Sequence, residues 1–157
     1  MSVLNKLSRL GLILPAPPKP LATYIPACLA GDLLFVSGVL PFRDGKLSAT
    51  GKLGHNLTIE QGYEAARLAL LNALAIIQDE LESFERVKKI VRLTGHVASA
   101  PGFVEQPAVV NGASDLLVEL FGERGRHARL ALGAAELPLH APIELELIVQ
   151  VQETGAC

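Results

Sequence analysis

One arginine near the end of the chain is notable because it lies in an otherwise apolar stretch. Arg129 is surrounded by alanine and leucine at residues 128–132. A guanidinium group on such a strand is costly unless it is paired, and its planar fork binds a carboxylate through two hydrogen bonds. We therefore interpret Arg129 as an anion-binding residue. A structural ion pair with Glu144 or Glu146 of a neighbouring subunit is the alternative.

Two glutamates further along the chain could act on a water molecule. Glu144 and Glu146 are two residues apart in an alternating apolar and polar stretch, so their side chains share one face of a strand. One carboxylate could polarise water while Arg129 holds a bound anion. A solvated face of an antiparallel sheet is the competing interpretation of the same pattern.

Three further positions carry polar groups suited to a binding cleft. The Tyr24 phenol follows a proline-rich stretch, although tyrosine is also an ordinary interface residue. Asn111 is expected at the start of a helix, where capping is the alternative role. Ser37 and Gly38 lie together either at the edge of a cleft or in a turn at the end of a strand.

The histidines and cysteines do not suggest a metal centre. Neither residue type shows the short ligand spacings that are typical of zinc sites, and there is no CxxC motif. Cys28 lies in an apolar run and is expected to be a small buried residue. Motifs of the GxGxxG, P-loop and GxSxG types are also absent. We expect no metal and no cofactor.

Charge and hydropathy limit the partners. The chain of 157 residues has 14 lysines and arginines against 16 aspartates and glutamates. Nucleic-acid-binding domains usually carry a basic face, so a nucleic acid partner is not expected. One local basic cluster could contact phosphate or be a solvated loop; it contains Arg124, Arg126, His127 and Arg129. Apolar runs are too short for a membrane span, and the start of the chain does not resemble a signal peptide. We expect a cytoplasmic protein.

Helices and strands must bring these side chains together. The clearest pattern is a capping box at Thr58 and Gln61, followed by apolar residues at helical spacing. Helices are predicted at residues 2–11, 59–81 and 106–121, and strands at 25–30, 33–37, 46–49, 87–97, 127–132 and 143–151. This order predicts an α+β fold in which two helices cover one face of a mixed sheet.

The domain organisation follows from the same patterns. Residues 1–21 read as an N-terminal arm with a short helix and a proline-rich connector, and residues 22–157 as a single domain. Two helices would leave the second sheet face bare, although its strands are apolar. Contact between copies in a closed ring would cover that face, so we expect a homo-oligomer.

A series of motifs runs from Tyr24 to the C-terminus in this order: Tyr24, Ser37-Gly38 within LLFVSGVLP, Asn111, HAR at 127–129, ELP at 136–138 and IELELI at 143–148. With this series the chain resembles the Rid family, also called YjgF/YER057c/UK114, in its longer branch labelled endoribonuclease L-PSP-like. It implies a chorismate-mutase-like fold and a homotrimer with a cleft at each subunit interface. It also implies hydrolysis of small enamines and imines to 2-keto acids and ammonia.

The resemblance also implies roles for individual residues. Arg129 would hold the carboxylate of the substrate and Glu144 would position water. The substrate-binding positions would be Tyr24, Ser37, Gly38, Asn111 and Ala131. Many relatives have a cysteine where this chain has Ala131, which leaves only backbone groups for contact. The alternatives are a trimer that binds small carboxylates without turnover, and an endoribonuclease, against which the acidic balance and the lack of stacking aromatics argue.

Overall fold

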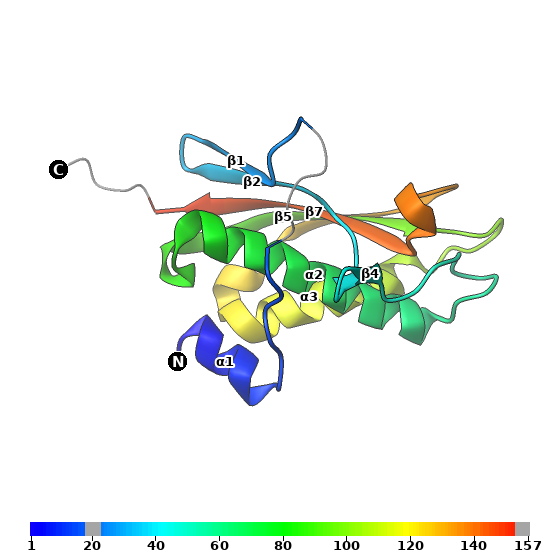
Figure 1. Cartoon of the computed structure of the whole chain (residues 1–157), viewed down its shortest axis with the longest axis horizontal. Coiled ribbons are helices and arrows are strands. Elements are labelled where there is room, and N and C mark those ends of the chain that lie inside the picture. Colours follow the sequence, from blue (N-terminus) through cyan, green and yellow to red (C-terminus); the bar gives the residue numbers. More distant parts are fainter. Residues whose placement is uncertain (18–22, 153–157) are drawn as a thin grey trace.

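The computed structural model describes residues 1–17 and 23–152 (Figure 1). The end of the predicted arm at residue 21 and the terminal Cys157 lie outside these residues. The helices are α1 (Val3–Arg9), α2 (Ile59–Leu81) and α3 (Gln106–Phe121). The strands are β1 (Ala27–Ala30), β2 (Leu33–Val39), β3 (Phe42–Arg43), β4 (Lys46–Leu47), β5 (Val87–Ala98), β6 (Ala128–Ala134) and β7 (Ile143–Val151).

Five strands form one sheet in the order β1-β2-β7-β5-β6. Strands β5 and β6 run parallel, and the other neighbouring pairs are antiparallel. The predicted mixed sheet of an α+β fold is therefore confirmed. Strand β6 is an edge strand in the single chain, and β3 and β4 form a separate two-stranded ribbon.

Helices α2 and α3 pack side by side against one face of this sheet (Figure 1). The capping box predicted for α2 is present, because the Thr58 hydroxyl accepts from the Gln61 amide and the Gln61 side chain accepts from the Thr58 amide. These two bonds satisfy backbone donors that a helix start otherwise leaves unpaired. The predicted range of this helix matches α2 at both ends.

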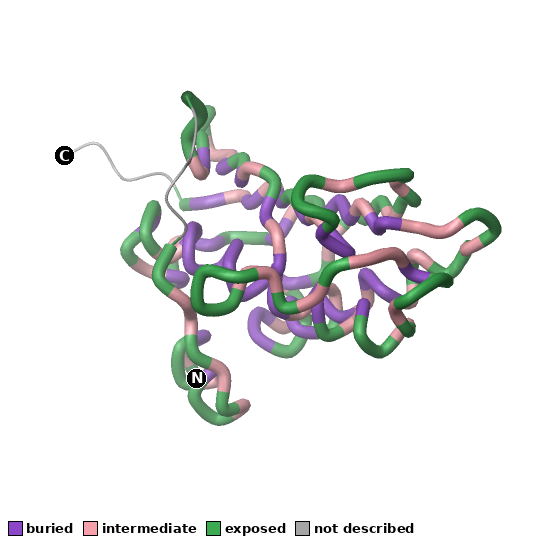
Figure 2. Tube along the Cα trace, turned by 45° about the vertical axis from the view of Figure 1, so that its right-hand side comes forward, coloured by how far each residue is buried: buried purple, intermediate pink, exposed green. Residues whose placement is uncertain are grey.

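The sheet has one buried face and one open face, as Figure 2 indicates by alternating burial along the strands. Along β7 every second side chain from Ile143 to Val151 is almost completely buried against the helices. The residues between them point to the other face. That open face carries apolar side chains in contact with solvent, among them Phe35, Leu130 and Leu132, which are 42%, 38% and 43% exposed.

The short helix predicted at residues 2–11 is present as α1 (Val3–Arg9). It packs on α3 rather than on a strand, and its Val3 and Leu7 are both 2% exposed. The Lys6 ammonium donates to the carbonyl of Leu120 at 2.8 Å and of Glu119 at 3.2 Å, at the end of α3. Cations at helix C-termini are favourable, so Lys6 helps to fix the arm.

Several smaller expectations need correction. Strand β1 begins at Ala27 instead of residue 25, β2 continues to Val39 instead of residue 37, and β4 ends at Leu47 instead of residue 49. Cys28 is exposed rather than buried, because its side chain points away from the helices on the edge strand β1. Strand β6 begins one residue later than predicted and continues to Ala134, because its pairing with β5 extends to Ala98. None of the helices found in residues 1–17 and 23–152 has the length and apolar character needed to cross a bilayer.

Candidate functional site

Arg129 lies on β6 and points toward α3. Its Nη1 donates to Oδ1 of Asn111 at 2.7 Å and to Oγ of Ser114 at 3.2 Å. The residue beside it on β5 is Leu93, which is fully buried in the core under the helices. Arg129 is therefore on the helix side of the sheet, at its exposed β6 edge.

Asn111 is the sixth residue of α3 and does not cap it. The residue that precedes the helix is Glu105, which makes no side-chain capping bond. The alternative of a capping role for Asn111 is therefore wrong. Its carboxamide oxygen instead accepts from Arg129 and helps to hold the guanidinium in place.

A histidine and a serine that the sequence did not single out as a pair adjoin Arg129. The Nε2 atom of His127 lies 3.0 Å from Oγ of Ser114, and its Nδ1 lies 2.6 Å from the Gly125 carbonyl oxygen. Burial lowers the pKa of His127; the Gly125 carbonyl opposes this shift and Arg129 adds to it. The spacing was available as a signal: Ser114 is three residues after Asn111 on a helix, and His127 is two before Arg129.

Ala131 is on the same side of the sheet as Arg129, two residues further along β6. It is partly buried and packs against the core, opposite Gly95 of β5. The structure thus brings Arg129 and Asn111 into contact, and it places Ala131 on the same face of the edge strand β6.

Glu144 lies on the open face, in register with His96 of β5. Burial raises the pKa of the Glu144 carboxyl; Glu146 adds to this shift and His96 opposes it. A Cβ atom at Gly38 would overlap the Glu144 carboxylate, so the glycine provides the space in which this side chain lies. Glu144 and Gly38 are therefore in contact.

Ser37 and Gly38 lie inside β2, where the pairing with β7 shifts between Val36 and Val39. The alternative of a turn at the end of a strand is therefore wrong. The Ser37 hydroxyl donates to the Ile25 carbonyl at 2.6 Å. This bond ties β2 to the segment that contains Tyr24, whose side chain is 53% exposed.

The candidate residues thus form two groups on opposite faces of one sheet. Arg129, Asn111 and Ala131 are on the helix side at the β6 edge, whereas Glu144 and Gly38 are on the open side. Within residues 1–17 and 23–152 neither Arg129 nor Glu144 makes an ion pair. A single subunit does not bring the arginine and the glutamate to one site.

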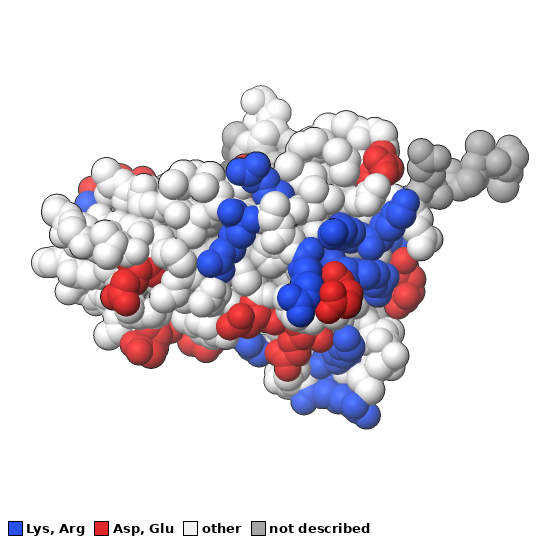
Figure 3. Space-filling view, turned by 180° about the vertical axis from the view of Figure 1, so that it is seen from behind, with Lys and Arg blue, Asp and Glu red and all other residues white. Residues whose placement is uncertain are grey.

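The other members of the predicted basic cluster have their own partners. Arg124 donates to the Val87 carbonyl at 2.9 Å, and Arg126 forms an exposed ion pair with Glu123 at 2.9 Å. Figure 3 shows acidic groups among the basic ones on the back face of the molecule. These contacts favour the interpretation of a solvated surface over that of a phosphate site.

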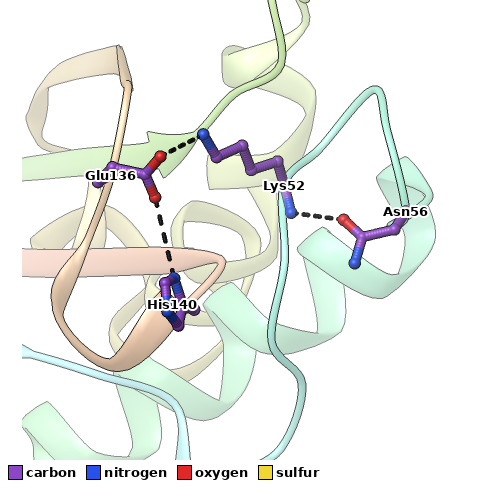
Figure 4. A network of polar contacts seen from close by, with 4 residues as sticks. All are labelled: Lys52, Asn56, Glu136 and His140. Carbon is purple, nitrogen blue, oxygen red and sulfur yellow. Dashed lines mark hydrogen bonds and ion pairs between the residues drawn. The ribbon is translucent and has the colours of Figure 1, made fainter.

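A separate hollow of about 370 Å³ lies between the loop at residues 50–56 and the β6–β7 connection. Glu136 pairs with Lys52 at 2.6 Å and lies 3.9 Å from His140 (Figure 4). The hydrogen bond from Lys52 lowers the pKa of Glu136. Among the residues that the structure describes, no three His, Cys, Asp or Glu side chains are grouped as metal ligands.

Known proteins resemble this chain over nearly its whole length. Residues 5–151 match the family model described as YjgF/chorismate mutase-like, putative endoribonuclease. Protein TCP17 of Trypanosoma cruzi is 43% identical over 150 residues, which cover 95% of this chain and 94% of that protein.

Two solved structures have the same fold at considerable sequence identity. Protein Atu1372 of Agrobacterium tumefaciens is 40% identical, with a TM-score of 0.91, over 96% of this chain and 92% of that one. A putative endoribonuclease from Shewanella oneidensis is 36% identical, with a TM-score of 0.93, over 96% of this chain and all of that one.

Proposed function

This chain belongs to the YjgF/chorismate mutase-like family, and from that premise we propose that it hydrolyses small enamines and imines to 2-keto acids and ammonia. The substrates are the reactive, carboxylate-bearing products that arise from 2-amino acids. The observation that carries the proposal is the position of Arg129, whose guanidinium lies at an exposed strand edge and is held by Asn111 at 2.7 Å.

The proposed site lies between subunits of a homotrimer. Arg129 and Glu144 point away from opposite faces of the sheet, so one cleft can contain both only if each comes from a different subunit. The exposed leucines of β6 and Phe35 of β2 supply apolar surface for that contact. Soluble monomers rarely leave such patches uncovered.

The reaction divides between these two residues. Arg129 holds the substrate carboxylate, and Glu144 accepts a proton from the water that attacks the carbon of the C=N bond. As the C–O bond forms, the electron pair of the C=N bond moves to nitrogen, which takes the proton back from Glu144, and a carbinolamine results. Glu144 then accepts the hydroxyl proton and passes it to the nitrogen, so that the C–N bond breaks, ammonia leaves and the C=O bond forms. Burial raises the pKa of the Glu144 carboxyl, which makes its carboxylate a better proton acceptor.

A second candidate function is binding of small carboxylates without turnover. Ala131 favours it, because the thiol that many relatives carry at this position is missing. In that case Arg129 would still bind the carboxylate of the ligand, and Glu144 would transfer no proton.

Release of ammonia and 2-keto acid from imines generated in solution by an amino acid oxidase tests the proposal. We expect wild type to accelerate release and Arg129→Ala to reduce the rate by roughly 100-fold, because a positioned charge is lost. The exposed Arg126 is a matched control, and Arg126→Ala should retain activity. Carboxylate binding without any acceleration would favour the second function.

A further inference from the structure

A continuous chain of hydrogen bonds reaches Arg129 from the loop before β6. It runs from the Gly125 carbonyl through His127 and Ser114 to Nη1 of Arg129, with distances of 2.6, 3.0 and 3.2 Å. We propose that Ser114 and His127 are positioning residues, which hold the guanidinium so that it offers its Nε and Nη2 hydrogens to a carboxylate. This inference rests on the proposed function, because it specifies how the same site holds its ligand.

The direction of each bond follows from the groups involved. A backbone carbonyl can only accept, so Nδ1 of His127 carries a proton. Neutral His127 then has an unprotonated Nε2, which accepts from the Ser114 hydroxyl. The oxygen of that hydroxyl is free to accept from Arg129. The half-buried position of His127 favours the neutral ring, because burial disfavours the charged form.

Both hydrogens of Nη1 are used in this arrangement. One goes to Oδ1 of Asn111 and the other to Oγ of Ser114. The bonds that Arg129 makes within the described residues all start from Nη1. A carboxylate that binds through two parallel bonds must therefore approach along the edge formed by Nε and Nη2.

Local geometry explains why these side chains meet. Ser114 follows Asn111 by three residues on α3, which places both on one face of the helix. His127 is two residues before Arg129, on the same side of the backbone. Without the serine, Nη1 would keep a single bond to Asn111, and the guanidinium of an exposed arginine would be free to rotate.

Affinity for pyruvate, a small 2-keto acid, is the first test, and it needs no turnover. We expect Ser114→Ala to raise the Kd by about 3- to 10-fold, as expected for one lost hydrogen bond to a charged group. Ser114→Thr keeps the hydroxyl and should stay within about twofold of wild type on the same scale. Asp115→Ala, at the next position on α3, is the matched control and should bind as wild type does.

The outcomes separate the two proposals. Unchanged affinity in Ser114→Ala together with lost binding in Arg129→Ala would overturn the positioning role and leave the carboxylate site intact. If wild type and Arg129→Ala bind pyruvate equally well, or if neither binds it, the carboxylate site itself is overturned.

Nitrogen NMR of the His127 ring is a second test that needs no ligand. We expect the proton on Nδ1 and an unprotonated Nε2 at pH 7.5. A proton on Nε2 and none on Nδ1 would be incompatible with this series of hydrogen bonds. That result would overturn the inference whatever affinities for pyruvate are measured. The double variant Ser114→Ala/His127→Phe should bind pyruvate no more weakly than Ser114→Ala alone. The effects of substitutions within one hydrogen-bonded network on binding free energy do not add.

Discussion

Arg129 and Glu144 extend from opposite faces of the same sheet. Arg129 is in register with the buried Leu93, and Glu144 is in register with His96, which belongs to the other face. Side chains alternate between the faces of a strand, so no rotamer change brings the two groups together within one subunit. A reaction that uses both therefore requires a second copy of the chain.

Gly38→Ala should impair activity while the protein stays folded. The added methyl would overlap the Glu144 carboxylate, which is the flexible end of a long side chain and can move aside. Displacement of the proton acceptor should lower kcat by about 10- to 100-fold, as small misplacements commonly do. In a Glu144→Gln background Gly38→Ala should cause no further loss, because the proton acceptor is already absent there. Wild-type kcat in the single variant would contradict the role of Glu144.

Leu132→Arg should convert the proposed trimer to monomers, because it places a charge in the apolar contact that we propose between subunits. The matched control is Val118→Arg on α3, since Val118 is 38% exposed and Leu132 is 43% exposed. Molar mass from light scattering after size exclusion measures the effect. A trimer mass for Leu132→Arg, or a monomer mass for wild type, would show that the open face is not the interface.

His127 should make stability depend on pH. Burial lowers its pKa in the folded chain, so the unfolded chain binds more protons as the pH falls below about 6.5. Stability is therefore lost on acidification through that range. Denaturant unfolding at pH 7.5 and 5.5 should show a smaller loss for His127→Gln than for wild type. The exposed His55 serves as control, and a loss in His127→Gln equal to that in His55→Gln would contradict the assignment.

Local signals predicted the main elements of the fold well. The capping box at Thr58 and Gln61 set the start of α2 because its two hydrogen bonds are made between neighbours in sequence. Alternation of apolar and mostly polar residues from Ile143 to Val151 predicted β7, since one face of that strand is buried under helices. Both patterns depend on interactions that the sequence itself makes visible.

Other features depend on contacts between distant residues and were missed. Cys28 was expected to be buried because its neighbours are apolar, but β1 is an edge strand with an open side. The partners of Arg129 were not recognised, because Ser114 meets the arginine only once α3 has packed beside β6. The sequence suggested functional roles for Arg129 and Glu144. That they lie on opposite faces of the sheet could be seen only from the strand order and register.

Mixing two inactive variants tests the central claim most directly. Arg129→Ala and Glu144→Gln subunits are unfolded together in equal amounts, refolded and assayed for imine hydrolysis. If each cleft takes its arginine from one subunit and its glutamate from the next, a mixed ring of three has one native cleft. Random assembly should then restore about a quarter of wild-type activity. A mixture no more active than its parents would contradict a site shared between subunits.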